Sequence, residues 1–208
     1  IVDRTNAFRK GEGRAPVATN ADLAAAARYF ADYMAANDEY GHTADGKGPG
    51  DRAKAHGYEY CIVLENIAYA FDSRGFDTGP LADEFFNGWK ASPGHRKNML
   101  DPDVTETAVA VARSAKTGYY YAVQMFGRPR SLAIEFKIEN RSGEPVRYAV
   151  GGRTFELPPR VTRTHTRCRP AEVTFRWPGK EAGTAVKPAN GDRFAVTKDG
   201  AAFAVKKE

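Results

Sequence analysis

Three residues in the first half of the sequence carry side chains that could act together: His42, Glu65 and His95. His42 lies in the irregular, glycine-rich stretch EYGHTADGKGPGDR, which is typical of a loop at a surface or cleft. Glu65 lies in the apolar run CIVLENIAYAF, where a buried carboxylate must stay protonated or find a partner such as a histidine or a metal ion. His95 follows Ser-Pro-Gly, a turn signal that would end the preceding helix and aim the imidazole.

Two imidazoles and one carboxylate are consistent with two kinds of chemistry. They are ligand types that zinc accepts, and they are also groups that transfer protons near neutral pH. The three residues are far apart in the sequence, so a third interpretation stays open, in which they only satisfy one another's hydrogen bonds. The remaining histidines, His56 in DRAKAHG and His165 in RTHTR, are expected to be exposed.

Elements with helical periodicity are expected to position these residues. Apolar residues recur at three- and four-residue steps before residue 100, and Asn20 is a plausible N-cap. DRAKAHG is interpreted as a short, basic helix that stops at Gly57. Helices are predicted over 1–10, 21–36, 51–57 and 81–92.

The period changes to two after Val104, which indicates strands. Residues 107–127 are predicted to form a β-hairpin. Turn signals containing Gly or Pro, among them WPGKEAG at 177–183, then separate short strand-like segments every few residues. We therefore predict an α+β chain: a mixed domain at 1–127, a linker at 128–131, and a small all-β, sandwich-like domain at 132–208.

The positive charge of the chain is concentrated in the predicted β domain. The net charge is +5, and residues 131–208 hold 15 Lys and Arg against 9 Asp and Glu. This excess could attract an anionic envelope polymer, or it could be an ordinary solvated surface. The basic residues alternate with apolar ones and form no block with interleaved aromatics, so we predict no nucleic-acid binding. No apolar run is long enough for a transmembrane segment.

An ordered set of motifs runs through the predicted mixed domain: GHT (41–43), DR (51–52), GY (57–58), LENIAYA (64–70), Trp89, SPGHRKNMLDP (92–102) and VQMFG (123–127). With this set, residues 1–127 resemble the CAP superfamily, which includes cysteine-rich secretory proteins, antigen 5 and pathogenesis-related proteins. The resemblance is closest to the bacterial, SCP-like branch, and residues 131–208 lie outside it. It implies an α-β-α sandwich with a central antiparallel sheet and a cleft that holds two His and two Glu.

By this resemblance, His42 and His95 match the two histidines and Glu65 matches the first glutamate. The histidine pair can bind a divalent cation in the family, often zinc, so His42 and His95 become the expected metal ligands. Ser92 stands where eukaryotic members have the second glutamate, and the tetrad is incomplete. Glu106 is a further carboxylate that could approach the cleft from another side.

The two cysteines, Cys61 and Cys168, fit no zinc or redox motif. In an oxidising compartment they could pair and join the two domains; alternatively they are two unrelated buried thiols. The chain begins without Met, so we interpret it as a processed or trimmed form of a secreted or periplasmic protein.

Three functions follow from the residues and the resemblance. We favour a binding protein whose cleft holds a divalent cation and a small or lipid-like ligand, with the β domain attached to an anionic envelope polymer. The first alternative is a metal-assisted, peptidase-like hydrolase with Glu65 as its base. The second is an envelope interaction protein in which the His/Glu cluster is purely structural.

Overall fold

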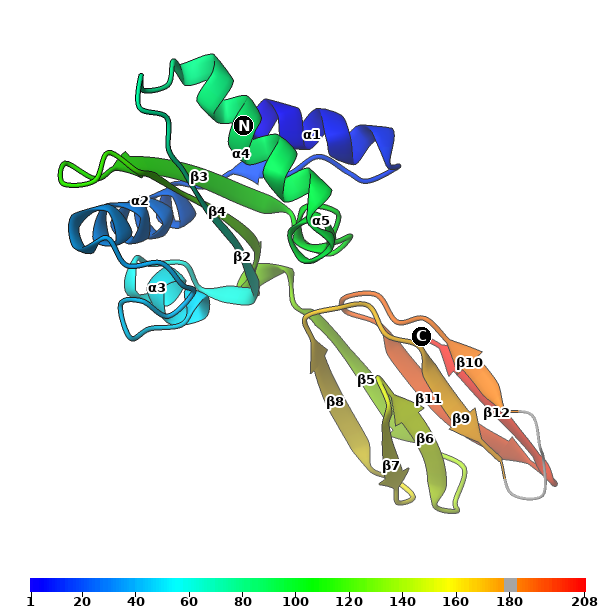
Figure 1. The fold of residues 1–208 in the computed structure, drawn as a ribbon. Helices are drawn as coiled ribbons and strands as arrows, with labels where there is room; N and C mark the ends of the chain where they lie inside the picture. Colours follow the sequence, from blue (N-terminus) through cyan, green and yellow to red (C-terminus); the bar gives the residue numbers. More distant parts are fainter. Residues whose placement is uncertain (178–182) are drawn as a thin grey trace. The chain divides into compact units, whose positions relative to one another are not determined.

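A computed structural model describes residues 1–177 and 183–208 and divides the chain into two compact units, Ile1–Ser131 and Leu132–Glu208. The first unit is an α-β-α sandwich and the second is all β, as predicted (Figure 1). Residues 128–131, predicted as a linker, lie at the end of the first unit. Strand β4 runs to Pro129, and a 3-10 turn covers Arg130–Leu132.

The first unit is organised on a four-stranded sheet with the order β1-β3-β4-β2. Its pairs are antiparallel except for β1 with β3, which is parallel. No helix or strand was predicted over residues 60–70, which form an 11-residue strand. A strand covered by helices on both faces shows no alternation, and this one reads as a continuous apolar run. The strands are β1 (Ala18–Thr19), β2 (Tyr60–Ala70), β3 (Glu106–Arg113) and β4 (Tyr120–Pro129).

Helices cover both faces of this sheet, with α2 and α3 on one side and α1, α4 and α5 on the other (Figure 1). The last helix was missed because Ser-Pro-Gly was interpreted as a turn; Pro93 instead occupies the first helical turn, where proline is favoured. Among the described residues, no helix is long and apolar enough to cross a membrane. The helices are α1 (Val2–Gly11), α2 (Ala21–Asn37), α3 (Pro49–Ala55), α4 (Thr78–Ala91) and α5 (Pro93–Met99).

The longest helix, α2, provides much of the core of the first unit. Its predicted cap is confirmed, because the Asn20 side chain accepts hydrogen bonds from the backbone N–H groups of Asp22 and Leu23 at 2.9 and 3.0 Å. Leu23 and Phe30 are fully buried against β3 and β4. The apolar stripe thus presses α2 onto the sheet.

The second unit contains two four-stranded sheets, with the orders β10-β9-β6-β7 and β12-β11-β5-β8. One apolar core joins inward-facing residues of both sheets, including Phe136, Tyr148 and Trp177. The turn predicted at 177–183 lies mainly outside the described residues. The strands are β5 (Ile134–Asn140), β6 (Val146–Val150), β7 (Arg153–Leu157), β8 (Thr162–Arg167), β9 (Val173–Arg176), β10 (Thr184–Val186), β11 (Arg193–Asp199) and β12 (Ala202–Lys207).

The two cysteines both lie in the described part of the chain, and neither is a free thiol. Cys61 belongs to β2 in the first unit, and Cys168 follows β8 in the second. The alternative of two unrelated thiols is therefore not supported. That Cys61 and Cys168 pair with each other stays a prediction.

His165 is buried, which corrects the expectation that it is exposed. Its side chain is 8% exposed, stacks on Phe136 with ring centroids 5.1 Å apart, and shares a 2.8 Å hydrogen bond with the Tyr148 hydroxyl. The alternation of β8 is opposite to the one assumed, since the threonines face outward and the histidine faces the core. Burial and the neighbouring charges of Arg163 and Arg167 lower the pKa of His165.

This buried histidine predicts that the second unit loses stability in mild acid. Because its folded pKa is lowered, the unfolded chain takes up a proton first as the pH falls through about 6.5. We expect the free energy of unfolding to be highest above this pH and to decrease below it. Denaturant titration followed by Trp177 fluorescence in a Trp89→Phe background measures this unit, because each unit holds one of the two tryptophans.

His165→Gln is expected to flatten the pH dependence, whatever its effect on stability at neutral pH. An equal slope between about pH 7.5 and 5.5 in both proteins would contradict the assignment of that dependence to His165.

Candidate functional site

A buried arginine, Arg52 of α3, is at the centre of the candidate site. It lies in the segment predicted as a short, basic helix, and its side chain is fully buried. One terminal nitrogen donates to both oxygens of Glu65 at 2.9 and 2.8 Å, and the other donates to Asp45 at 2.7 Å. The guanidinium also lies over the Phe30 ring, 3.5 Å from its centroid. Arg52 is therefore the partner that the Glu65 carboxylate required.

The same guanidinium fixes the loop that carries His42. It donates to the backbone carbonyls of His42 and Lys47 at 2.9 and 2.7 Å. Asp51, in the first turn of α3, accepts a 3.1 Å hydrogen bond from the Gly48 N–H, which caps the helix that follows the loop. An irregular, glycine-rich segment thus gains a defined conformation from one buried cation.

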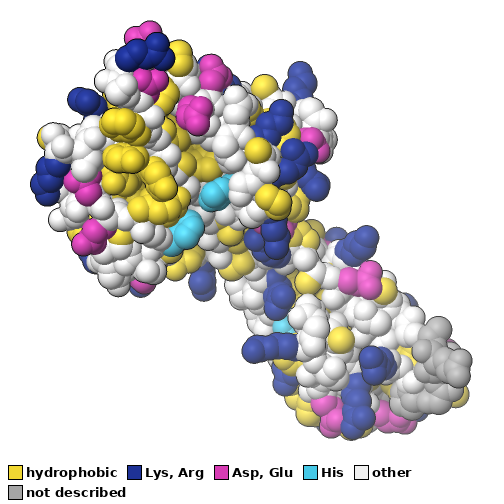
Figure 2. Space-filling model, viewed as in Figure 1, with side chains coloured by type: hydrophobic (Ala, Val, Ile, Leu, Met, Phe, Trp, Pro, Cys, Tyr) yellow, Lys and Arg dark blue, Asp and Glu magenta, His cyan; other side chains and the backbone are white. Residues whose placement is uncertain are grey.

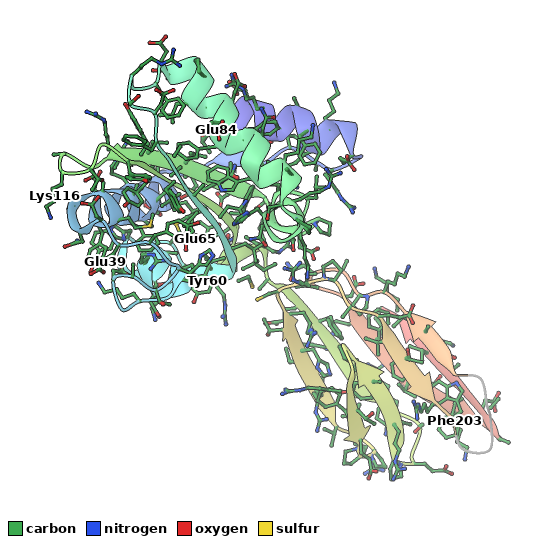
Figure 3. The ribbon with its side chains drawn as sticks, viewed as in Figure 1. Glu39, Tyr60, Glu65, Glu84, Lys116 and Phe203 are labelled. Atoms are coloured by element: carbon green, nitrogen blue, oxygen red, sulfur yellow. The ribbon has the colours of Figure 1, made fainter. Side chains whose placement is uncertain are left out.

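His42 contacts the carboxylate that Arg52 holds. Its Nδ1 lies 2.8 Å from Glu65 Oε1, and the histidine side chain is 51% exposed whereas that of Glu65 is 1% exposed. A carboxylate paired with arginine only accepts hydrogen bonds, so Nδ1 is the protonated nitrogen and donates to Glu65. In the neutral form of the ring, Nε2 of His42 is the nitrogen with a free lone pair. Figure 3 shows Glu65 inside the first unit, between β2 and α3.

His95 is positioned by a network of amide side chains that joins α5 to β2. Asn98 donates to the Glu65 carbonyl at 3.1 Å and to the Asn66 side chain at 2.9 Å. Asn66 in turn donates to the His95 carbonyl at 3.3 Å. Burial and the charge of a protonated His42 lower the pKa of His95. The structure therefore gathers His42, Glu65 and His95 in one region.

These contacts also cover the outer edge of β2, which is an edge strand of the sheet. The Ile67 carbonyl accepts hydrogen bonds from the Trp89 indole at 3.2 Å and the Tyr40 hydroxyl at 3.1 Å. With Asn98 on the Glu65 carbonyl, side chains satisfy backbone groups that an unprotected edge would expose.

Ser92 and Glu106 do not join the histidines by any hydrogen bond or ion pair of the described residues. Ser92 is the N-cap residue of α5. Glu106 begins β3, where it accepts hydrogen bonds from the Tyr58 hydroxyl at 2.5 Å and the Asn20 amide at 3.1 Å. Glu106 therefore has a structural role at the start of α2, and no second carboxylate of the described chain replaces the missing glutamate.

The described residues offer a poor fit to the predicted zinc site. They contain no group of three or more His, Cys, Asp or Glu side chains placed to hold a metal ion. Glu65 is occupied by Arg52, which leaves the imidazoles of His42 and His95 as ligands. Structural and catalytic zinc sites have three or four protein ligands. The donor set is therefore one ligand short of even an open, catalytic zinc site.

The first unit also exposes a cluster of aromatic side chains, which was not predicted from the sequence. Tyr40, Tyr69 and Phe71 are 46, 55 and 51% exposed. The Tyr40 and Tyr69 ring centroids are 4.9 Å apart, and Tyr119 links Tyr69 to Phe71 at 5.7 and 5.0 Å. Figure 2 shows histidine side chains at the margin of an apolar area on this unit.

Two cavities of the first unit lie away from the histidines. One, of about 720 Å³, is formed mainly by residues 72–77. The other, of about 640 Å³, lies between α1, α4 and β3 and is mostly apolar, with Phe76, Leu81, Val109 and Val111 among its lining residues. Neither is lined by His42, Glu65 or His95. The periodicity of β3 and α4 could have indicated the second one, since Val109 and Val111 face away from α2.

Comparison with known proteins identifies the class. The model of the cysteine-rich secretory protein family (CAP) matches residues 2–126, and the chain belongs to this family. The family-defining part therefore coincides with the unit that carries the histidines.

Individual relatives match the same part of the chain. The uncharacterized protein YkwD of Bacillus subtilis is 31% identical over 129 residues, which are 62% of this chain and 46% of YkwD. An extracellular protein of Bacillus anthracis with an SCP domain is 29% identical, with a TM-score of 0.50 over 61% of this chain and 38% of that one. An outer surface protein of Borrelia burgdorferi shares the fold, at 18% identity and a TM-score of 0.54, over 62% of this chain and 90% of that protein. The chain thus spans less than half the length of the curated relative YkwD.

The central position of Arg52 predicts a large loss of stability when it is removed. Arg52→Met would leave the Glu65 and Asp45 carboxylates buried without their cation, which costs about 3–5 kcal/mol. The measurement is denaturant unfolding followed by Trp89 fluorescence in a Trp177→Phe background.

Lys54→Met is the matched control, because Lys54 is an exposed cation on the same helix. We expect it to change the stability by less than about 0.5 kcal/mol. Equal effects of the two substitutions would contradict the central role of Arg52.

Proposed function

We propose that this chain is an extracellular binding protein whose CAP unit takes up a small, mainly apolar ligand. Membership in the CAP family and the extracellular description of the Bacillus anthracis neighbour support the location. The observation that carries the proposal is the apolar cavity between α1, α4 and β3. Its volume of about 640 Å³ is in the range of small-ligand sites, which are concave and mainly apolar.

The alternation of β3 explains how the cavity forms. Ala108 and Ala110 are buried on the side of α2, whereas Val109 and Val111 point to the opposite side and line the cavity. Leu81 and Ala82 of α4 line it from above the sheet, and Arg113 lies among the lining residues as a cation. Asp3 also lines the cavity and offsets this cation, so the mainly apolar walls suit a molecule with a large hydrocarbon part, such as a fatty acid.

The His/Glu cluster gives less support to a hydrolase. A general base needs a carboxylate that is free to take a proton, and Glu65 is held by Arg52 and His42. A serine mechanism would need a hydrogen bond between Ser92 and His95, and the described contacts of the two residues include none. The cluster acts in this proposal as a structural network that presents the His42 imidazole to solvent.

Filling the cavity should abolish binding of an apolar probe. Ala82→Trp places an indole among the lining residues, and we expect the affinity for cis-parinaric acid, a fluorescent fatty acid, to fall by at least about tenfold. Titration of the full chain by fluorescence measures this affinity.

The control is Ala25→Trp, an equal change at an exposed position of α2, on the other face of the sheet. Equal affinities of both variants, or no binding by the wild type, would refute the cavity as a ligand site.

In the predicted zinc site, the imidazoles of His42 and His95 would be the two protein ligands that hold the ion. Two protein ligands imply weak binding that a chelator removes. We expect native mass spectrometry to show at most one zinc ion on the wild type, and none on His42→Ala/His95→Ala. His56→Ala is the control. Zinc that survives chelation and is lost in Glu65→Gln would contradict this geometry and would favour the metal-assisted alternative.

A further inference from the structure

The two edge strands β7 and β8 of the second unit lie along one side of the sandwich (Figure 1), and both contain arginines. Phe155 of β7 and His165 of β8 have ring centroids 4.9 Å apart, so the two edges lie against each other. The Arg163 guanidinium lies over the Phe155 ring at 5.3 Å. These contacts make β7 and β8 one continuous surface.

Two further arginines lie at the end of this surface near the β6–β7 turn. The Arg167 guanidinium packs so closely against Gly151 that a Cβ at this position would clash with it. Arg153 begins β7 directly after this turn and is exposed. We call Arg153, Arg163 and Arg167 the arginine seam.

Carboxylates do not neutralise the arginine seam within the described residues. The ion pairs of the second unit join other cations: Arg141 with Glu139 and Glu208, Arg147 with Glu156, Lys198 with Glu144, and Lys207 with Asp192. No described pair includes a seam residue. Lys and Arg side chains are frequent on the visible face of this unit in Figure 2. The seam is therefore a site of uncompensated positive charge.

The spacing of the seam favours a chain of anions over a single one. Arg163 and Arg167 are four residues apart on one strand, about 13 Å along its axis. Arg163 turns toward Phe155 and Arg167 toward Gly151, so they do not converge on one point. Guanidinium groups bind phosphate oxygens through paired hydrogen bonds.

We propose that the arginine seam binds a linear polymer of phosphodiesters, with successive phosphates on Arg163, Arg167 and Arg153. Single-stranded nucleic acid is a poorer fit because it needs exposed aromatic rings for base stacking. The exposed large apolar residues of the described second unit are Leu132 and Val161, and neither is aromatic. This inference is independent of the ligand proposed for the CAP unit.

The test uses the full chain and poly(glycerol phosphate) as the probe, with affinities measured by calorimetry at several salt concentrations from about 50 to 200 mM. Arg153→Gln/Arg167→Gln is the main variant, because Arg163 also packs on the Phe155 ring. We expect at least about tenfold weaker binding at the lowest salt. The slope of log K against log salt should become shallower by about 1.4, since each lost phosphate contact contributes about 0.7.

The matched control is Arg176→Gln/Lys206→Gln, which removes the same charge from exposed positions outside the seam. Equal weakening by both variants would overturn the proposal, because binding would then follow net charge alone. Tighter binding of single-stranded DNA than of the probe would also overturn it. Absence of binding by the wild type would overturn the proposal as well. The arginines would then be explained as charges that keep the edge strands from pairing with other chains.

If Trp177 fluorescence shows that the main variant is unfolded, Arg153→Gln alone should reduce the slope by about 0.7. An unchanged slope in that variant would overturn the assignment of Arg153.

Discussion

The buried ion network of Arg52, Glu65 and Asp45 is the interaction on which the first unit depends. Arg52 is fully buried and hydrogen-bonds two carboxylates and two backbone carbonyls. It therefore connects α3, the 42–47 loop and strand β2 through one side chain. A buried pair contributes little net stability by comparison with apolar packing, but the loss of one partner is costly. The network thus specifies one arrangement of a loop that has no regular structure of its own.

This constraint separates the histidines from the cavity that we propose as the ligand site. The network holds His42 at the surface and His95 nearby, while the apolar cavity lies elsewhere, between α1, α4 and β3. A carboxylate that is already neutralised by arginine is unsuited to abstract a proton or to complete a metal site. The CAP unit is thereby interpreted as a scaffold with a rigid polar cluster, and the second unit as a charged β-sandwich with its own surface chemistry.

The fold could be predicted from motifs and periodicity, but several of its tertiary contacts could not. The apolar stripe of α2 and the hairpin of β3 and β4 are predicted by the periodicity of apolar residues. The division into two units is predicted by the change from helical to strand periodicity along the chain. Arg52 was missed because a basic segment indicates exposure, and only the tertiary structure brings Glu65 and Asp45 to it. His165 was misplaced because alternation in an edge strand does not say which face is buried. The gathering of His42, Glu65 and His95 followed from the family resemblance, whereas spacing alone could not predict it.

A double-mutant cycle between Arg52 and Glu65 tests the central claim most directly. The free energies of unfolding of the first unit would be measured for Arg52→Met, Glu65→Leu and the double variant, with Trp89 as the probe. If Arg52 holds Glu65 as an ionised partner, the two losses are non-additive, with a coupling of roughly 1–3 kcal/mol, and the double variant is more stable than Arg52→Met alone. Additive losses would contradict the account and would leave Glu65 as a carboxylate that is free for other chemistry.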